Sequence, residues 1–428
     1  MMNLKLQRII QKLEKKFPRK IDLTLDRQLK ILKKLGSPQD KLEQVISVVG
    51  TNSKYSICKS TMAILNEAGY KCNLFLSPHL QSYTERFVYN DNEISEENLI
   101  ELLEDTEKVI GDNPCTLFEA LTCGYLKYCE QFKDNITLIE AGLFHRFDST
   151  NVFKKNLGSI IGSIGIDHLQ FIKNKTIEGI IYEKTASLLN SNIFVNKQDN
   201  KEITSKIENA LKNNQSKKHF FGKDFNILKA ENSFIKYEDD QGSIILPEPS
   251  VLGIDHQLAN ISTSIAASRK LFNVKDEHIK KGVISIKLKG RLEEIKPGGN
   301  LNKFSKNKIY VDIAHNENAA RALRNWIDNS HSHFHLIIGM MKEKKHFDFG
   351  SALFKGSYKI RSVTLIDVPN TPSAISKEKL KKKFSNLYKN IKTKENIFDA
   401  IKSLNTRLDD KILITGSAYL CGEVLNLN

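Results

Sequence analysis

The sequence predicts an α/β protein with two domains, each formed around a mainly parallel sheet. Its 428 residues exceed what a single hydrophobic core usually organises. Short runs rich in β-branched residues alternate with amphipathic helical stretches, which is the pattern of parallel strands connected by helices. This alternation is interrupted once and then starts again. We therefore predict a larger N-terminal domain of residues 1–286 and a smaller C-terminal domain of residues 287–428.

The elements of the N-terminal domain are predicted from the spacing of its apolar residues. Residues 1–20 are basic and amphipathic and lack the compact apolar stretch of a signal peptide, so we expect a surface helix there. Helical patterns are also present at residues 60–68 and 96–109. Five short apolar runs have the length of buried strands, and they cover residues 45–49, 73–76, 136–139, 159–164 and 193–195.

The pattern changes after these strands. From His219 to Leu246, aromatic residues and isoleucine alternate with polar residues around Asp239–Gly242, which predicts antiparallel hairpins. A helix is expected at residues 257–272, and the basic, glycine-containing segment 281–291 is the candidate interdomain joint. The alternation of strands and helices then resumes and predicts a Rossmann-like C-terminal domain, with strands at residues 308–313, 335–340, 362–367 and 411–415.

Composition narrows the class of protein. Hydrophobic residues make up 40% of the chain and charged residues 27%, as in soluble proteins, and no apolar run approaches the roughly 20 residues of a membrane helix. We therefore expect a cytoplasmic protein without a membrane partner. Six cysteines without a CxxC pair argue against a disulfide framework and a zinc site. Cys123 and Cys129 lie in an apolar helical pattern and are expected to be small core residues.

The net charge of +15 is spread along the whole chain. Such a balance suits nucleic acid, but it also suits small polyanionic ligands such as ATP. Since no helix-turn-helix, zinc-finger or RNP-type motif accompanies the charge, we expect no nucleic-acid partner.

The segment VVGTNSKYS at residues 48–56 is the sharpest local motif. Gly50 ends a predicted strand, Lys54 lies in the following loop and Ser56 comes just beyond it. Backbone N–H groups at a helix N-terminus, together with a lysine side chain, are what a phosphate-binding loop requires. The segment departs from the strict GxxxxGK[ST] pattern, so on these residues alone an ordinary strand–turn–helix with a solvated lysine is the alternative.

Polar side chains follow three of the predicted strands. Ser77, Glu140 and His168 each come after an apolar strand, and in an open parallel sheet the carboxyl ends of the strands converge on one crevice. A hydroxyl, a carboxylate and an imidazole together can hold Mg²⁺, with waters and phosphate oxygens as further ligands. Each residue alone could equally have a structural role.

The C-terminal domain offers a similar position. Asp312 and His315 follow the predicted strand at residues 308–313 and could orient a nucleotide or an amine substrate. The alternating His331, His333 and His335 precede another strand. For these histidines we expect an exposed approach from loop to strand rather than a metal site.

In their order and spacing, the motifs of this chain resemble the folylpolyglutamate synthase/dihydrofolate synthase branch of the Mur ligase superfamily, almost from end to end. The N-terminal half carries the motifs IDLTLDR at 21–27, LGSPQD at 35–40, SPHL at 77–80, ER at 85–86, LFEALT at 117–122, EAGL at 140–143, DH at 167–168 and EK at 183–184. The C-terminal half carries HQ at 256–257 followed by Asn260, GRLE at 290–293, AHN at 314–316, GMMK at 339–342 and TGS at 415–417.

The resemblance implies a P-loop-type ATPase domain with a smaller Rossmann-like domain, and it implies roles for single residues. The ATP contacts would be Gly50, Thr51, Asn52, Lys54, Ser56, Asn260, Arg291 and Asp312. Mg²⁺ would be held by Ser77, Glu140 and His168, and the pterin or folate by Arg86, Phe118 and Asp148. The catalytic group would consist of Lys54, Glu140, His168, Lys184, Asp312 and His315. Lys184 matches a lysine that is carbamylated in this family.

Two segments depart from the family pattern. In the phosphate loop, usually GTNGKGS, the inner glycines are replaced by Ser53 and Tyr55. If such a position requires a positive φ, a side chain costs roughly 1 kcal/mol or more. In the segment usually written GLGGRLDATN, Phe144 and His145 replace the glycine pair and Ser149 replaces the alanine.

The resemblance implies an ATP-dependent ligase that joins L-glutamate to dihydropteroate, to reduced folates, or to both, through an acyl phosphate. A monomer is what the family suggests. Two alternatives are a catalytically retired folate- or nucleotide-binding paralogue and a Mur-type ligase with a different carboxylate acceptor. The departures at Ser53, Tyr55, Phe144 and His145 motivate both alternatives.

Overall fold

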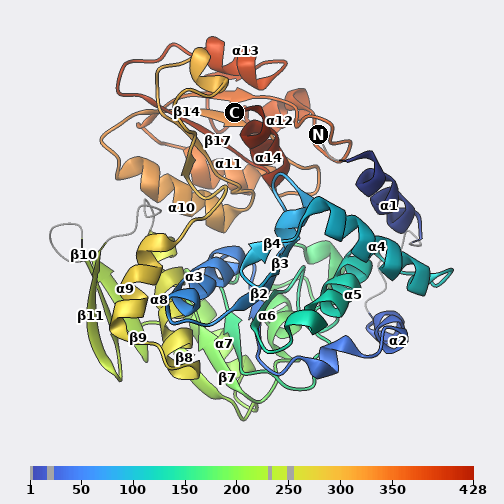
Figure 1. Cartoon of the computed structure of the whole chain (residues 1–428). Coiled ribbons are helices and arrows are strands. Elements are labelled where there is room, and N and C mark those ends of the chain that lie inside the picture. Colours follow the sequence, from blue (N-terminus) through green and yellow to red (C-terminus); the bar gives the residue numbers. More distant parts are fainter. Residues whose placement is uncertain (1–2, 17–23, 230–233, 248–254) are drawn as a thin grey trace. The chain divides into compact units, whose positions relative to one another are not determined.

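The computed structural model describes residues 3–16, 24–229, 234–247 and 255–428 (Figure 1). The chain divides into two compact units, the first within Met1–Pro249 and Gln257–Ile286 and the second within Ser250–His256 and Lys287–Asn428. Residues 17–20 of the expected N-terminal helix and residues 21–23 of the IDLTLDR motif lie outside the described residues.

An eight-stranded sheet in the order β4-β3-β2-β5-β1-β6-β7-β8 forms the centre of the first unit. Six of these strands, from β2 to β8 in that order, are parallel, and β3 and β4 add an antiparallel edge. The strands are β1 (Val45–Val49), β2 (Cys72–Phe75), β3 (Phe87–Tyr89), β4 (Asn92–Glu93), β5 (Ile136–Glu140), β6 (Gly158–Ile161), β7 (Asn192–Val195) and β8 (Lys217–Phe220). The chain adds β5 on one side of β1 and β6 on the other, so the carboxyl end of β1 lies where the order of the strands reverses, the usual ligand crevice of such sheets.

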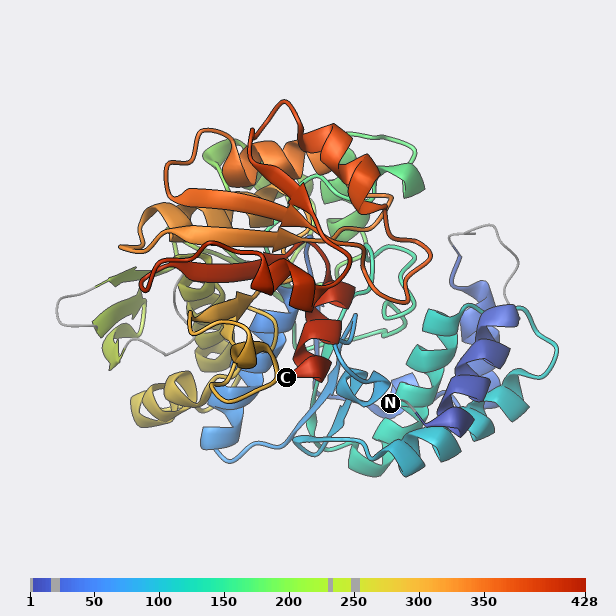
Figure 2. The same ribbon diagram turned by 90° about the horizontal axis from the view of Figure 1, so that it is seen from above.

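Helices cover both faces of this sheet. They are α1 (Leu4–Lys15), α2 (Asp26–Lys34), α3 (Lys54–Glu67), α4 (Glu96–Ile110), α5 (Leu117–Cys129), α6 (Ile177–Thr185), α7 (Lys201–Ala210), α8 (Asp255–Leu271) and α9 (Asp276–Ser285). Helix α3 packs on β1, β2, β5 and α9. Apolar residues of α5, α6 and α7 form clusters with the opposite side of the strands. Figures 1 and 2 show α1, α4 and α5 side by side.

The helix starts are encoded locally. The Ser95 side chain accepts a hydrogen bond from the Asn98 N–H at the start of α4. Thr116 and Glu119 form a reciprocal capping box at the start of α5, which satisfies backbone N–H groups that have no acceptor within the helix. Short 3₁₀ turns are present at Pro38–Lys41, Tyr83–Arg86, Glu130–Phe132, Leu169–Phe171 and Leu301–Lys303.

A separate antiparallel sheet consists of β9 (Phe225–Lys229), β10 (Phe234–Asp239) and β11 (Gly242–Pro247), which confirms the expected hairpins. The prediction was wrong at its start, because His219 and Phe220 belong to β8, a parallel strand of the large sheet. A short alternating segment does not reveal the direction of its partner strand.

The second unit contains a six-stranded sheet in the order β12-β13-β17-β14-β15-β16, parallel except for β12. Its strands are β12 (Glu293–Glu294), β13 (Ile309–Val311), β14 (Phe334–Ile338), β15 (Ile360–Leu365), β16 (Ile391–Thr393) and β17 (Lys411–Thr415). Its helices are α10 (Glu317–Asp328), α11 (His346–Phe354), α12 (Lys377–Phe384), α13 (Ile397–Lys402) and α14 (Ala418–Leu427). One apolar cluster joins α10, α11 and α12 to the sheet, and a second joins α13 and α14 to it.

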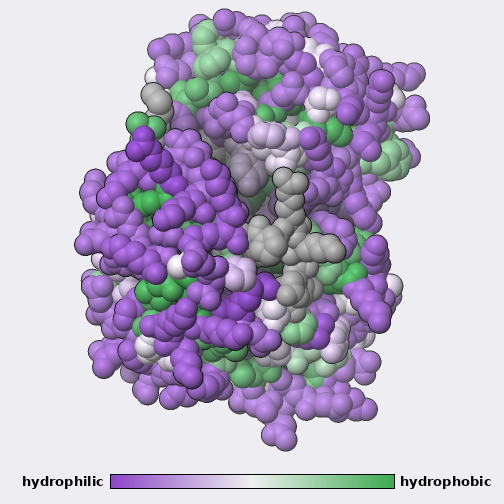
Figure 3. All heavy atoms as spheres, turned by 90° about the vertical axis from the view of Figure 1, so that its right-hand side faces the viewer, coloured by the Kyte–Doolittle hydropathy of each residue, from purple (hydrophilic) through white to green (hydrophobic). Residues whose placement is uncertain are grey.

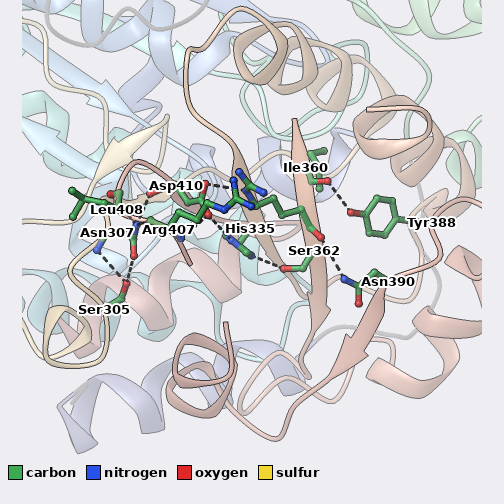
Figure 4. A network of polar contacts seen from close by, with 11 residues as sticks. Ser305, Asn307, His335, Ile360, Ser362, Tyr388, Asn390, Arg407, Leu408 and Asp410 are labelled. Atoms are coloured by element: carbon green, nitrogen blue, oxygen red, sulfur yellow. Dashed lines mark hydrogen bonds and ion pairs between the residues drawn. The ribbon is translucent and has the colours of Figure 1, made fainter. Parts of the chain in front are cut away.

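A buried polar network ties together the starts of β14, β15 and β17 (Figure 4). His335 hydrogen-bonds through Nδ1 to Ser362 Oγ at 2.7 Å and through Nε2 to Asp410 Oδ2 at 3.2 Å. The other carboxylate oxygen of Asp410 accepts from Arg361 Nε at 3.0 Å. The expectation of an exposed histidine was wrong for His335, because it pairs with these two partners inside the sheet and is 3% exposed.

All six cysteines are free and buried, and Cys123 and Cys129 lie in α5 as expected. Burial raises the pKa of Cys129 to about 11. Hydrophilic side chains predominate on the face drawn in Figure 3. Within the described residues, no helix has both the length and the apolar character needed to cross a bilayer.

Candidate functional site

The phosphate loop connects β1 to α3. At Gly50, φ is 153°, and an added Cβ atom would lie 2.9 Å from the Asn52 carbonyl oxygen and 3.1 Å from Gly162 Cα, so a side chain at this position has no space. The N–H groups of Thr51 and Asn52 donate to the Ser163 carbonyl at 2.9 Å and 3.1 Å. The loop is therefore held from behind by the segment that follows β6.

The first turn of α3 follows this loop directly. It consists of Lys54, Tyr55 and Ser56, whose N–H groups have no acceptor within the helix. Such N–H groups and the helix dipole attract a phosphate. Ser56 lies in the first turn of the helix, as expected from the sequence. The N–H groups of Thr51 and Asn52 instead donate to the Ser163 carbonyl.

Ser53 and Tyr55 have different backbone conformations. Ser53 precedes α3 with φ 76° and ψ −22°, in the left-handed region. Tyr55 lies within the helix and does not have a positive φ. Only the first of the two replaced glycines therefore occupies a position that favours glycine.

Lys54, Glu140 and Ser77 form the next part of the site. Lys54 Nζ lies 3.2 Å from the Gly50 carbonyl oxygen and 3.9 Å from Glu140 Oε1. Glu140 is the last residue of β5 and is buried, and its Oε2 accepts from the Ser77 N–H at 3.0 Å. The Ser77 hydroxyl is buried without a hydrogen-bond partner.

Lys184 comes from α6, below the same loop. Its Nζ donates to the Gly50 carbonyl at 2.8 Å and to the Leu143 carbonyl at 3.0 Å, and it lies 5.2 Å from the centre of the Phe144 ring. Burial, together with the nearby charge of Lys54, lowers the pKa of Lys184 to about 7. Near neutral pH a large fraction of this side chain is therefore an uncharged amine.

His168 completes this part of the site. It follows β6 in a left-handed conformation with φ 56°, and its side chain is 34% exposed, beside Asp167. A small pocket of about 20 Å³ is lined by Gly50, Thr51, Lys54, Gly142, Leu143, Phe144, Asp167, His168 and Lys184, with room for about one water molecule. Five predicted site residues thus meet in one pocket, which is also lined by Phe144. Glu140 adjoins it through Lys54, and Ser77 contacts Glu140.

These residues fit a hard divalent cation. Ser77, Glu140 and His168 supply a hydroxyl, a carboxylate and an imidazole, and the buried hydroxyl of Ser77 has no other partner. Oxygen ligands with remaining positions for water and phosphate are what Mg²⁺ requires. Over the described ranges, no group of three or more His, Cys, Asp or Glu residues is placed to hold a metal, so phosphate oxygens and waters would have to complete the coordination.

Two of the three residues predicted to contact the acceptor, Phe118 and Asp148, lie beside this pocket. The Phe118 ring, in the first turn of α5, packs directly over Gly142 and stacks on Phe75 with ring centres 5.7 Å apart. Asp148 accepts from the Leu143 N–H at 2.9 Å and from the Thr150 hydroxyl at 2.7 Å. Asp148 thereby fixes the shape of the 142–151 loop.

Arg86 lies on a different segment. Its Nε donates to His79 Nδ1 at 2.8 Å, and its guanidinium lies over the Tyr83 ring at 5.4 Å. Burial and the nearby charge of Arg86 lower the pKa of His79 to about 3, so His79 is a neutral acceptor for this hydrogen bond.

The residues that replace the family pattern in the 142–151 loop are packed into the interior. Phe144 lies over Lys184, and His145 is buried, with its pKa lowered to about 4 chiefly by burial. The Ser149 hydroxyl hydrogen-bonds to Thr122 at 2.8 Å, and its carbonyl accepts from Gln28 at 2.6 Å. The loop is therefore well packed despite its divergent sequence.

Asn260 is placed apart from the pocket residues. It lies on α8 and is 1% exposed. Its amide oxygen accepts from Asn196 at 2.7 Å, and its amide nitrogen donates to Gln257 at 3.0 Å. Both ends of the side chain are thus engaged inside the protein.

In the second unit, Arg291, Asp312 and His315 gather at the end of β13. Asp312 accepts from the Leu292 N–H and from the Ala314 N–H, both at 2.9 Å. Burial raises the pKa of Asp312, and the nearby charge of Arg291 opposes this rise. His315 Nδ1 lies 2.9 Å from the Ile313 carbonyl oxygen. Asp312 therefore fixes the backbone next to Arg291 as well as the loop that carries His315.

The segment behind the phosphate loop was not predicted from the sequence. Gly162 fits only without a side chain, because a Cβ atom would lie 2.5 Å from the Asn52 carbonyl oxygen. The Gly165 N–H and carbonyl both hydrogen-bond to the Thr51 hydroxyl, at 3.1 Å and 3.0 Å. Gly162 inside the predicted strand 159–164, together with Gly165 directly after it, was the signal that could have indicated this close approach.

The fold and the site define a class: two-unit α/β proteins that bind a nucleotide phosphate where the strand order of a parallel sheet reverses. Residues 299–427 match the family model of the dihydrofolate synthetase C-terminal domain. A dihydrofolate synthase/folylpolyglutamate synthase of Buchnera aphidicola is 28% identical over 409 residues, covering 93% of this chain and 91% of the relative. Over most of its length the chain is therefore similar to dihydrofolate synthase/folylpolyglutamate synthases.

Solved structures show the same fold. E. coli FolC in complex with DHPP and ADP aligns with a TM-score of 0.85 at 23% identity, over 98% of this chain and 97% of that one. The bifunctional folylpolyglutamate synthase/dihydrofolate synthase of Yersinia pestis, complexed with AMPPNP and Mn ion, aligns with a TM-score of 0.84 at 22% identity, over 98% and 97%.

Proposed function

We propose that this chain is an ATP-dependent, ADP-forming ligase that adds L-glutamate to dihydropteroate, to reduced folates, or to both. The observation that carries the proposal is the meeting of Lys54, His168 and Lys184 in one pocket at the phosphate loop. The ADP bound to the E. coli protein and the AMPPNP and manganese bound to the Yersinia protein support ATP and a divalent metal such as Mg²⁺ as the cofactors.

The reaction has two steps. In the first, the acceptor carboxylate attacks the γ-phosphorus of ATP, which forms an acyl phosphate and releases ADP. In the second, the glutamate amine attacks the acyl carbon, and inorganic phosphate leaves. Lys54 and the first turn of α3 stabilise the charge on the phosphoryl group during transfer.

Ser77, Glu140 and His168 would hold Mg²⁺, which supplies charge neutralisation to the phosphates when bound. Glu140 is oriented for this role by the Ser77 N–H. For Lys184 we propose carbamylation, in which the uncharged amine that its lowered pKa makes available adds to dissolved CO₂ and releases a proton. The nearby ammonium group of Lys54 would then face a negative charge.

We assign the ATP and pterin sites to residues 1–286 and the binding of glutamate to residues 287–428. Phe118, Asp148 and Arg86 are proposed to shape the acceptor site. Arg291, Asp312 and His315 are proposed to act on the nucleotide and the amine, with Asn260 as a further nucleotide contact. A monomeric, cytoplasmic enzyme is part of the same proposal.

The test is to incubate the purified protein with Mg-ATP, L-glutamate and either dihydropteroate or a reduced folate, and to analyse the products by mass spectrometry. We expect the mass of one added glutamate with at least one acceptor, and loss of this product in the Lys54→Met variant. Tight binding of folate and ADP without any product would favour a retired paralogue. Binding of ADP but not of folate would favour a ligase with another carboxylate acceptor.

A further inference from the structure

Behind the phosphate loop, a second layer of buried amide side chains extends from β7 to α8. Asn196 and Gln198 follow β7, and Asn260 lies on α8. All three are at least nine-tenths buried, with exposed fractions of 3%, 7% and 1%. The proposed reaction uses neither Asn196 nor Gln198.

Gln198 holds the segment Gly162–Ile164 at both of its ends. Its Oε1 accepts from the Ile164 N–H at 2.9 Å, and its Nε2 donates to the Gly162 carbonyl at 3.2 Å. Between these two residues lies Ser163, whose carbonyl accepts the N–H groups of Thr51 and Asn52. The Gln198 side chain therefore fixes the position of the Ser163 carbonyl, which in turn accepts hydrogen bonds from the phosphate loop.

The same amide is itself held in place. Gln198 Nε2 also donates to the Asn196 carbonyl at 2.7 Å. The Asn196 side chain donates to Asn260 at 2.7 Å and accepts from the Thr263 hydroxyl at 2.9 Å. A continuous hydrogen-bonded path thus connects α8 with the phosphate loop. Because each amide along it is buried, a missing partner is costly.

We propose that Gln198 is a positioning residue for nucleotide binding, which sets the phosphate loop through the Ser163 carbonyl without touching the ligand. This inference rests on the proposed binding of ATP at that loop. Asn260 anchors the far end of the path through Asn196.

The test uses Gln198→Glu, which keeps the shape of the side chain and its acceptor oxygen but replaces the donor NH₂ with a second acceptor. At pH 8 two carbonyls would then face a carboxylate, and we expect ADP to bind about tenfold or more weakly by calorimetry, as for an unsatisfied buried group. As the pH falls, the buried carboxyl gains a proton and can donate again. The ratio of mutant to wild-type affinity should therefore recover. A purely structural defect would not produce this pH-dependent rescue.

Gln28→Glu is the matched control, because Gln28 is a buried glutamine that donates to the Ser149 carbonyl in a different loop. The ADP affinity of Gln28→Glu should stay within about twofold of wild type at pH 8. In free energy, a twofold change is a small fraction of one buried hydrogen bond. If Gln198→Glu does not fold, Gln198→Met gives the same comparison without a charge: weaker ADP binding than wild type supports the proposal, and equal binding overturns it.

Hydrogen exchange of the ligand-free protein tests the positioning role of Gln198 independently of whether the protein binds ATP. We expect the amides of Thr51 and Asn52 to exchange faster in Gln198→Glu than in wild type. Unchanged exchange and unchanged ADP affinity would refute the positioning role. Failure of the wild-type protein to bind ADP would instead refute the proposed function, while the exchange result would still report on the loop.

Discussion

Ser53 holds the turn into α3 in a left-handed conformation, with φ 76°. A non-glycine residue in this region costs about 1–2 kcal/mol, which is partly offset because glycine loses more entropy on folding. We expect Ser53→Gly to stabilise the protein by about 0.5 kcal/mol and Tyr55→Gly to destabilise it by about 1 kcal/mol, since Tyr55 lies within a helix. Urea denaturation of both variants measures this difference, and equal effects would contradict it.

Lys184 makes stability depend on pH. Its pKa is about 7 in the folded protein and about 10.4 in an unfolded chain. Between these two values the unfolded state binds one more proton, so the free energy of unfolding rises with pH and the contribution is lost as the pH falls towards 7.

We compare wild type with Lys184→Met in CO₂-free buffer. The difference in their free energies of unfolding should shift in favour of wild type from pH 7 to pH 10, by at most about 1.4 kcal/mol per pH unit. A pH-independent difference would show that Lys184 keeps an ordinary pKa.

The residues of the site were predictable where their position follows from topology. Glu140 ends β5, and Ser77 and His168 come after β2 and β6. The carboxyl ends of parallel strands lie at one edge of a sheet whatever the details of the loops. The position of Asn260 beneath the surface was not predictable, because its partner Asn196 is 64 positions away in the chain. The same holds for Gln198, whose role depends on two backbone groups of another loop.

Among the elements, α5 and the 142–151 loop are in close contact beside the site. A Cβ atom on Gly142 would lie 2.4 Å from Phe118 Cε1, so Gly142→Ala must displace the ring. We expect a loss of about 1–3 kcal/mol. In a Phe118→Ala background the same change should cost much less. Thermal or urea denaturation of the four proteins in this double-mutant cycle measures the coupling, and additive effects would refute the contact.

The network at the starts of β14, β15 and β17 makes a second pH prediction. Burial is the main reason why the pKa of His335 is lowered, and the hydrogen bond to Asp410 opposes this shift. An unfolded histidine titrates near 6.5. The contribution of His335 is therefore complete above that pH and is lost as the pH falls through the lowered folded value.

The only tryptophan of the chain, Trp326, lies 4.9 Å from Phe334 between ring centres and reports on this unit. We expect its fluorescence to show an unfolding free energy that decreases from pH 7.5 to pH 5.5, by at most about 1.4 kcal/mol per pH unit for this residue. In His335→Gln the unfolding free energy should decrease less over this pH range. An unchanged pH dependence would show that His335 is not the titrating group.

The nine strands that were predicted could be recognised because short apolar runs of three to six residues, bounded by polar loops, have few alternatives. Of the nine strands predicted for the two large sheets, β1 and β17 have the predicted bounds, and the other seven differ by one to three residues at one or both ends, whereas β3, β4, β12 and β16 were not predicted. The start of α3 was placed six residues late, at 60 instead of Lys54. Its first turn is made by the phosphate loop, which carries polar residues in place of an apolar periodicity.

On the scale of the whole molecule, both units place polar side chains of the candidate sites at the carboxyl ends of their strands. The carboxyl ends of the strands carry the polar groups of the site, such as Glu140 in the first unit and Asp312 in the second. The amino ends of the second sheet carry the His335 network, which joins strands to each other. Substitutions at the amino ends should therefore change stability before they change the chemistry.

The six buried cysteines can report on local and global unfolding of the molecule. Cys58, Cys72, Cys115, Cys123 and Cys129 lie in the first unit and Cys421 in the second. A thiol reagent can reach them only when the surrounding structure opens, at a rate set by local or global unfolding. Pulsed alkylation followed by mass spectrometry should therefore time the opening of each unit separately. A ligand that binds only the first unit should delay the five cysteines of that unit and leave Cys421 unchanged.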